Sequence, residues 1–324
     1  MSLDLVLRSV FSTFFLASVI RICTPIILPS MGALVSSAAG VSNMALEGIM
    51  LWGAFTGVFV SAYTGNVWLA VLAGCVVGVL VALLLAVAHL QFGSDRLLAG
   101  LAINLFSSGG TVFLMFTLIG EKGNTSTLAS LSVPNVTIPI IHQIPILGPI
   151  LSGHPVFTYL AFFLTWVVYI LMYRTRLGVH MRAVGENPEA ATTMGINVKK
   201  VRYIALGISG FMAALGGMSL SMAYLQMFQR EMAAGRGFIG IAANRLGGGH
   251  PLGTLLSAML FGVADALANQ LGSMDIPSQL VQSIPFATVV IGLAVFAIQK
   301  RRAEIERRKK YLQEEPEEVA VEAS

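Results

Sequence analysis

The sequence predicts an all-α integral membrane protein, in which a polytopic bundle of helices crosses the bilayer many times. Of the 324 residues, 56% are hydrophobic and only 11% are charged, and the mean hydropathy is +0.79. This composition leaves too few polar residues to cover a water-soluble fold. Apolar runs of about 20 residues, long enough for a hydrocarbon layer of ~30 Å, recur along the chain. Because a helix satisfies its own backbone hydrogen bonds in lipid, each crossing is predicted to be helical.

About ten crossings are predicted, and eight of them are full helices. The full-length segments are residues 5–27, 44–62, 67–90, 96–118, 156–173, 203–225, 252–271 and 281–299. Two glycine-containing apolar segments, 31–43 and 237–249, are too short for straight spans, so we expect broken or half-length crossings there. Glycines spaced as GxxxG, at 53–57 and 74–78, predict close contact between helices. The transmembrane domain is therefore assigned to residues 1–299, and residues 300–324 form a charged cytoplasmic tail.

The basic residues predict the orientation, because ten crossings place both termini on one side of the membrane. Fifteen basic residues share that side: Arg8, Arg96, Arg174, Arg176, Arg182, Lys199, Lys200, Arg202, Lys300, Arg301, Arg302, Arg307, Arg308, Lys309 and Lys310. Only Lys122, Arg230 and Arg236 fall on the other side. Basic loops stay in the cytoplasm, so the first group is predicted to be cytoplasmic. Since these residues flank spans and serve topology, the net charge of +4 does not indicate nucleic-acid binding.

The long loop on the external side, residues 119–155, holds five prolines among apolar side chains. Because proline interrupts helices, we expect extended segments and short elbows that lie at the membrane surface. Such a loop either contacts an external partner or is solvated without one.

A short polar helix is predicted inside the cytoplasmic coupling segment, residues 175–202. Residues suited to the N-cap, the first turn and the C-terminal stop stand in those places: Asn187, Pro188, Glu189 and Gly195. A helix of about two turns is marginal alone, because nucleation costs more than so few hydrogen bonds return. The small face formed by Ala190, Ala191 and Met194 would fit a groove on a partner protein. A plain connector would be capped in the same way, so both interpretations remain open.

The stretch "GENPEAATTMGI", which follows "RTRLGVHMRA", resembles the coupling segment of the permease subunits of bacterial ABC importers. The branch it resembles handles sugars, nucleosides and branched-chain amino acids. The resemblance extends through "AAGVSNMALEGIMLWGAF", "LLAGLAINL", "IPILGPIL" and "GGGHPLGTLLSAMLFG", and so covers residues from about 20 to 299. Within this branch, "GVSNMALEG" resembles the form found in nucleoside-type permeases.

This resemblance implies a division of labour in a bacterial plasma membrane. A pair of permeases forms the pathway, two ABC ATPase subunits use ATP and Mg²⁺, and an external solute-binding protein delivers the solute. A nucleoside is the expected solute, a simple sugar is the alternative, and the second permease is expected to be a paralogue. This chain has no GxxxxGK[ST] stretch and no metal-ligand cluster, so we expect no cofactor in it.

The resemblance also implies which residues couple the chain to the ATPases, moving as a lever when the ATPases close. They are Gly185, Glu186, Asn187, Pro188, Glu189, Ala190, Ala191, Met194, Gly195 and Ile196.

Polar residues inside the predicted spans are costly in lipid and should face the bundle interior. The candidates for the substrate pathway, together with two aromatic residues that could stack on a base, are Asn43, Glu47, Asn104, Phe106, Asp265, Asn269, Gln270 and Phe286. The polar ones would equally serve interhelical hydrogen bonds, or ion pairs with Arg21 or Arg245. A self-sufficient ion-coupled transporter, with Asp265 and Glu47 as carriers, is the alternative from another functional class.

Overall fold

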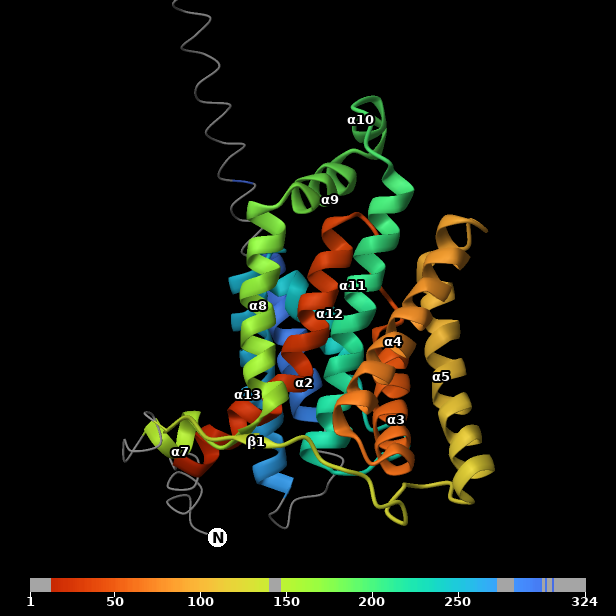
Figure 1. Cartoon of the computed structure of the whole chain (residues 1–324). Helices are drawn as coiled ribbons and strands as arrows, with labels where there is room; N and C mark the ends of the chain where they lie inside the picture. The colour runs from red at the N-terminus through yellow and green to blue at the C-terminus, as the bar shows by residue number, and fades with distance from the viewer. Residues whose placement is uncertain (1–12, 140–146, 273–282, 299–300, 302–304, 306–324) are drawn as a thin grey trace, which may run out of the picture.

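The computed structural model describes residues 13–139, 147–272, 283–298, 301 and 305. These residues form a bundle of helices whose axes run between two opposite faces of the molecule (Figure 1). Within this part of the chain, seven helices are long and apolar enough to cross a membrane. The predicted all-α membrane fold is therefore confirmed.

Most consecutive helices are joined by short turns, and longer connections precede α8 and α12. In chain order they are α2 (Thr13–Ala38), α3 (Leu46–Thr64), α4 (Val67–Leu90), α5 (Arg96–Ile119), β1 (Asn135–Val136), α7 (Leu147–Leu151), β2 (His154–Pro155), α8 (Val156–Arg174), α9 (Arg176–Glu186), α10 (Pro188–Thr193), α11 (Val198–Met218), the π-helical turn η1 (Ser219–Tyr224), α12 (Arg236–Leu246) and α13 (Pro251–Gly272). A further apolar helix spans Ser283–Ile298.

The centre of the bundle is formed by α2 and α11, which pack side by side. α11 also packs on α3 and α4, while α2 packs on α12 and α13. Glycine permits the close approach, because a Cβ atom added at Gly53 would lie 2.8 Å from the backbone of Ala214. A Cβ atom at Gly57 would lie 2.7 Å from the sulfur of Met222, and Gly78 also contacts Ala214. The close helix contacts predicted from the GxxxG patterns are therefore confirmed.

The prediction of two separate crossings at 5–27 and 31–43 is wrong, because residues 13–38 form one continuous helix. α2 runs through Pro25 and Pro29 without a break. Gly216 of α11 and Gly240 of α12 lie directly against Pro29. These neighbours shield the backbone groups that proline leaves unpaired, so the helix continues. The break in the helix comes afterwards, in the non-helical turn between α2 and α3.

The direction of α2 contradicts the predicted side of the N-terminal end of the chain. α2 contacts both α7 and α9, and its first residue, Thr13, lies at the face opposite α10 (Figure 1). The prediction placed the N-terminus on the same side as α10. With residues 13–38 as a single crossing, the predicted number of crossings falls by one. Residues 1–12, including Arg8, lie outside the described residues.

The second predicted short segment is confirmed as a short helix. α12 has 11 residues and is largely buried. It follows a loop, residues 225–235, in which Gln226, Glu231 and Ala234 have φ values of 55°, 55° and 49°. Left-handed backbone at three non-glycine residues is costly and is typical of functional sites.

The external loop contains the extended segments and the short elbow that its prolines predict. Strands β1 and β2 pair antiparallel, with Asn135 opposite Pro155 and Val136 opposite His154. The five-residue helix α7 lies between them in sequence. Residues 140–146 lie outside the described residues, and contact with an external partner stays a prediction.

Candidate functional site

Helices α9 and α10 form a corner that projects from one face of the bundle (Figure 1). The side-chain oxygen of Asn187 accepts hydrogen bonds from the backbone N–H groups of Glu189 at 3.1 Å and Ala190 at 3.0 Å. Pro188 takes the first helical position, and Gly195 follows the helix with a φ of 79°. The capped short helix that the sequence predicts is therefore confirmed.

The outward face of this corner is formed by Glu186, Ala190 and Met194, and Met194 is 82% exposed. Ala191 is only 4% exposed, so its predicted place on the outward face is wrong. The reason is helical geometry: Ala190 and Met194 are four residues apart and share a face, whereas Ala191 lies about 100° further round. The exposed surface of α10 thus includes Ala190, Thr192 and Thr193 but not Ala191.

The corner is packed against the end of α2. A Cβ atom on Gly185 would collide with the carbonyl oxygen of Ala38 and would lie 3.1 Å from the backbone nitrogen of Gly40. The guanidinium of Arg96 donates a hydrogen bond to the carbonyl of Gly40 at 3.2 Å, which holds the same turn from α5. α9 is therefore in direct backbone contact with the turn at which α2 ends.

A stack of side chains joins α9 to the start of α13. The guanidinium of Arg182 lies 5.0 Å from the ring centroid of Tyr173, near the end of α8. That ring centroid lies 5.3 Å from the ring of His250, the residue before α13. Contacts of these kinds are each worth roughly 0.5–1.5 kcal/mol. These side-chain contacts are a second connection between the α9–α10 corner and the bundle.

Two candidate pathway residues hold the unwound backbone between α2 and α3. The side chain of Asn43 accepts the N–H of Ala45 at 3.0 Å and donates to the hydroxyl of Ser209 at 3.0 Å. The side chain of Asn104 accepts the N–H of Gly48 at 2.8 Å and donates to a carbonyl of the break at 2.9 Å. These bonds pair backbone groups that an interrupted helix would leave unsatisfied. The interhelical role left open by the sequence is therefore observed for both asparagines.

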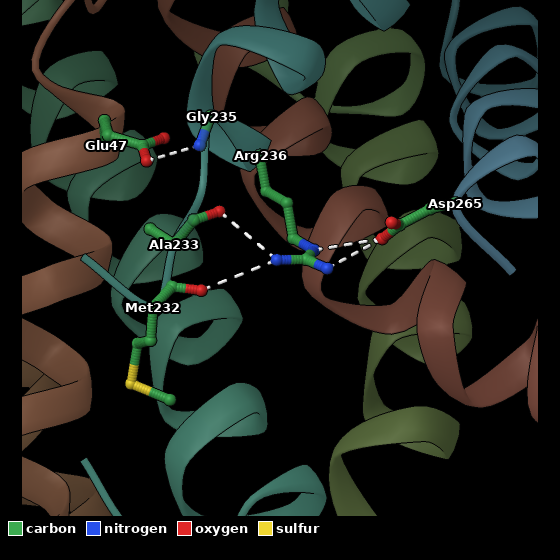
Figure 2. A network of polar contacts seen from close by, with 6 residues as sticks. All are labelled: Glu47, Met232, Ala233, Gly235, Arg236 and Asp265. Atoms are coloured by element: carbon green, nitrogen blue, oxygen red, sulfur yellow. Dashed lines mark hydrogen bonds and ion pairs between the residues drawn. The ribbon is translucent and has the colours of Figure 1, made fainter. Parts of the chain in front are cut away.

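Glu47 anchors the start of α12. Its carboxylate accepts the backbone N–H of Gly235 at 2.7 Å (Figure 2) and that of Gly237 at 2.8 Å. A carboxylate at a helix N-terminus satisfies free N–H groups and complements the helix dipole. A Cβ atom at Gly237 would come within 2.5 Å of the Glu47 backbone, so glycine is needed for this approach.

Arg236 forms an ion pair with Asp265, as Figure 2 shows. Its Nη2 and Nε atoms donate to Asp265 Oδ2 at 2.8 and 3.2 Å, and Nη1 donates to two backbone carbonyls of the preceding turn. The prediction that Arg236 lies in an external loop is wrong, because the chain folds back and places this residue inside the bundle. The sequence offers Arg21 and Arg245 as charge partners for the polar residues of the spans, but the ion pair that Asp265 forms among the described residues is with Arg236.

A cavity of about 580 Å³ lies between α3, α5 and the start of α12. Within the described residues its lining consists of Glu47, Leu51, Leu101, Asn104, Leu105, Ser108, Glu231, Ala234, Gly235 and Phe238. Glu231 accepts a hydrogen bond from the hydroxyl of Ser108 at 3.1 Å. Glu231, Ser108 and Phe238 are missing from the predicted set. Glu231 follows Arg230, which is predicted on the external side, and Ser108 and Phe238 do not stand out within their apolar segments.

The other candidates lie apart from this cavity, so the predicted set does not form one site. Phe106 is 63% exposed on α5, with its ring 6.1 Å from that of Trp52. A second cavity of about 190 Å³ is lined by Asp265, Asn269 and Phe286. Asn43 is buried, and Gln270 is half-buried on α13. Ala234 lines both cavities, which places them on either side of the start of α12.

A bundle of apolar helices in which α12 is too short to span alone, with cavities on the start of α12, is the arrangement expected of a membrane transport protein. The family described as "Branched-chain amino acid transport system / permease component" matches residues 15–298. The chain belongs to this family of permeases.

Two curated relatives are similar over most of their length. The chain is 35% identical to the guanosine ABC transporter permease protein NupQ of Bacillus subtilis, over 84% of this chain and 88% of the relative. It is 35% identical to the nucleoside ABC transporter permease protein NupC of Lactococcus lactis, over 86% and 91%. Among solved structures it resembles PsaBC from Streptococcus pneumoniae in complex with Fab, with a TM-score of 0.52, 12% identity and coverage of 90% and 95%. This structural likeness shows the fold alone.

Proposed function

We propose that the chain is the pathway-forming permease subunit of an ATP-driven importer of nucleosides. The solute is supported by two relatives whose names state guanosine and nucleoside transport, and by the stretch "GVSNMALEG". A simple sugar is the weaker alternative. Separate ABC ATPase subunits use ATP and Mg²⁺, and this chain holds neither.

The observation that carries the coupling role is the exposed corner of α9 and α10, packed against the end of α2. An ATPase subunit docks on Ala190 and Met194 and supplies the contacts that a helix of six residues lacks alone. When the ATPases close, α9 moves and Gly185 pushes on Ala38. The break held by Asn43 then shifts with α2, which converts one packing of the bundle into another.

A second permease, a paralogue of this chain, completes the larger cavity. α5 forms one wall and only 17% of its most apolar window is buried within the described bundle, so its outer face needs cover. The half-buried hydroxyl of Ser108 and the exposed carboxylate of Glu231 make lipid an unfavourable neighbour for this face. An external solute-binding protein docks at the opposite end from α10, where β1, β2 and α7 lie.

We propose nine crossings from Thr13 to Ile298 in a bacterial plasma membrane, in place of the predicted ten. Residues 225–246 make one crossing, as a re-entrant loop followed by α12, and Ser283–Ile298 makes the last. The basic residues of α9–α11 support a cytoplasmic location for the coupling corner. The tail that begins at residue 300 then lies on the cytoplasmic side, and Thr13 lies on the external side.

Uptake of labelled guanosine into proteoliposomes tests the function. We expect accumulation when both permeases, the ATPase subunits, the binding protein and ATP are present, and none when the ATPase subunits are left out. Accumulation that persists without ATPase and collapses with an ionophore would establish the ion-coupled alternative instead. Competition by unlabelled nucleosides, and not by pentoses or hexoses, separates a nucleoside importer from a sugar importer.

A further inference from the structure

Glu231 places an exposed carboxylate beside the middle of α5, on the wall of the larger cavity. Its side chain meets the hydroxyl of Ser108 at 3.1 Å. Ser108 is close to the midpoint of α5, roughly 17 Å from each end at a rise of 1.5 Å per residue. The carboxylate therefore lies near the middle of the crossing although the rest of its loop contacts the external segment around Gly123.

This position is incompatible with a lipid-facing surface. An ionisable side chain at mid-membrane costs several kcal/mol unless it faces water or protein. Glu231 also has a left-handed backbone, with a φ of 55°. A strained, exposed and charged residue persists only where the surrounding fold requires it there, which is typical of a binding site.

The two carboxylates that line the larger cavity differ in how many hydrogen bonds they accept from the protein. The carboxylate of Glu47 accepts two backbone N–H groups from the start of α12. Glu231 accepts one hydrogen bond, from Ser108, at Oε1. Among the described residues, its Oε2 atom has no protein donor. Glu231 therefore retains acceptor capacity that a solute can use, whereas Glu47 serves the fold.

The remaining walls suit an uncharged, partly apolar solute. Leucines at 51, 101 and 105 and the half-exposed ring of Phe238 form an apolar side. Lysine, arginine and histidine are missing from the lining within the described residues. A cavity of about 580 Å³ is in the size range of small-molecule sites. A flat ring can pack on Phe238 while hydroxyl groups reach the carboxylate.

We propose that Glu231 is a specificity-determining residue that accepts hydrogen bonds from the 2′- and 3′-hydroxyls of a ribonucleoside. A carboxylate is only an acceptor, so it selects solutes that carry hydroxyl donors, and its two oxygens match a vicinal diol. This inference rests on the proposed function, because it names the part of the nucleoside that the permease reads.

The test is the ratio of guanosine to 2′-deoxyguanosine uptake in proteoliposomes that contain the complete importer. Each nucleoside is supplied with the same binding protein, so a change in the ratio between permease variants reports the permease alone. The wild-type importer should prefer guanosine, because only guanosine has the 2′-hydroxyl that donates to the charged carboxylate. Glu231→Gln removes this charge and should therefore lower the ratio about tenfold. The matched control, Glu121→Gln, changes an exposed carboxylate outside the cavity lining and should leave the ratio unchanged.

A ratio that stays at the wild-type value in Glu231→Gln, even if both uptake rates fall, would overturn the proposal. If Glu231→Gln does not assemble, Ser108→Ala tests the same point, because it removes the group that orients the carboxylate and keeps the charge. That variant should lower the ratio about threefold, and an unchanged ratio would again overturn the proposal. Uptake of neither nucleoside by the wild-type importer would refute the proposed function itself.

Discussion

Removing one partner of the Arg236–Asp265 ion pair should destabilise the protein more than removing both. The two side chains are only 16% and 13% exposed, so Asp265→Asn leaves the guanidinium without its counter-charge in a largely buried place. An unpaired buried charge costs about 3–5 kcal/mol. Arg236 keeps hydrogen bonds to two backbone carbonyls, so we expect the lower end of that range, about 3 kcal/mol.

The double variant Arg236→Met with Asp265→Leu removes both charges and keeps most of the volume. It should lie within about 1 kcal/mol of the wild type, because the desolvation of two ions offsets their attraction. The single variants Arg236→Met and Asp265→Leu, taken together with the double variant, form a cycle whose coupling energy should be at least about 2 kcal/mol. Thermal unfolding of the purified protein in detergent gives the order of stabilities, with Glu121→Gln as a surface control. A double variant as unstable as the sum of the single variants would refute this reasoning.

Three other substitutions test the α9–α10 corner, the anchoring of α12 by Glu47 and the N-cap of α5. Gly185→Ala forces a methyl group onto Ala38, so ATP-driven uptake should fall several-fold while ATP hydrolysis by the complex continues, and equal loss of both activities would contradict a coupling role. Glu47→Gln places an amide N–H₂ against a backbone N–H and should lower stability by about 1–3 kcal/mol, and an unchanged melting temperature would disprove the anchoring role. Hydrogen bonds from the backbone N–H groups of Leu98 and Leu97 hold the pKa of Asp95 below its usual range. The stabilisation by this cap is fully present above the pKa that Asp95 has in the unfolded chain, and it disappears as pH falls through the lower pKa of Asp95 in the folded protein. The melting temperatures of wild type and Asp95→Ala should therefore converge below about pH 4. A difference that stays constant on acidification would show that the carboxylate charge is irrelevant.

The sequence predicts best those elements whose ends are determined by local chemistry. The predicted spans 67–90 and 96–118 match α4 and α5, because Asn66 and Asp95 cap their first turns. The coupling helix was predictable for the same reason, since Asn187 and Gly195 act within the segment itself. Such signals need no knowledge of the surrounding fold.

The errors arise where neighbouring helices decide the outcome. The predicted gap between the segments 5–27 and 31–43 contains Pro29, but glycines from two other helices pack against this proline and α2 continues. Arg236 and Glu231 follow a polar stretch that reads as an external loop, yet the chain folds back and carries both into the bundle. Their depth depends on contacts with α5 and α13, which no local pattern in the sequence encodes.

The most direct test of the coupling account is site-directed cross-linking from α10 in intact cells. Cysteine replaces Ala190, Met194 or, as the matched control, the buried Ala191. The account predicts covalent adducts between the ATPase subunit and positions 190 and 194, identified by mass spectrometry, and none from position 191. Absence of an ATPase adduct at both exposed positions, in cells that transport normally, would contradict it.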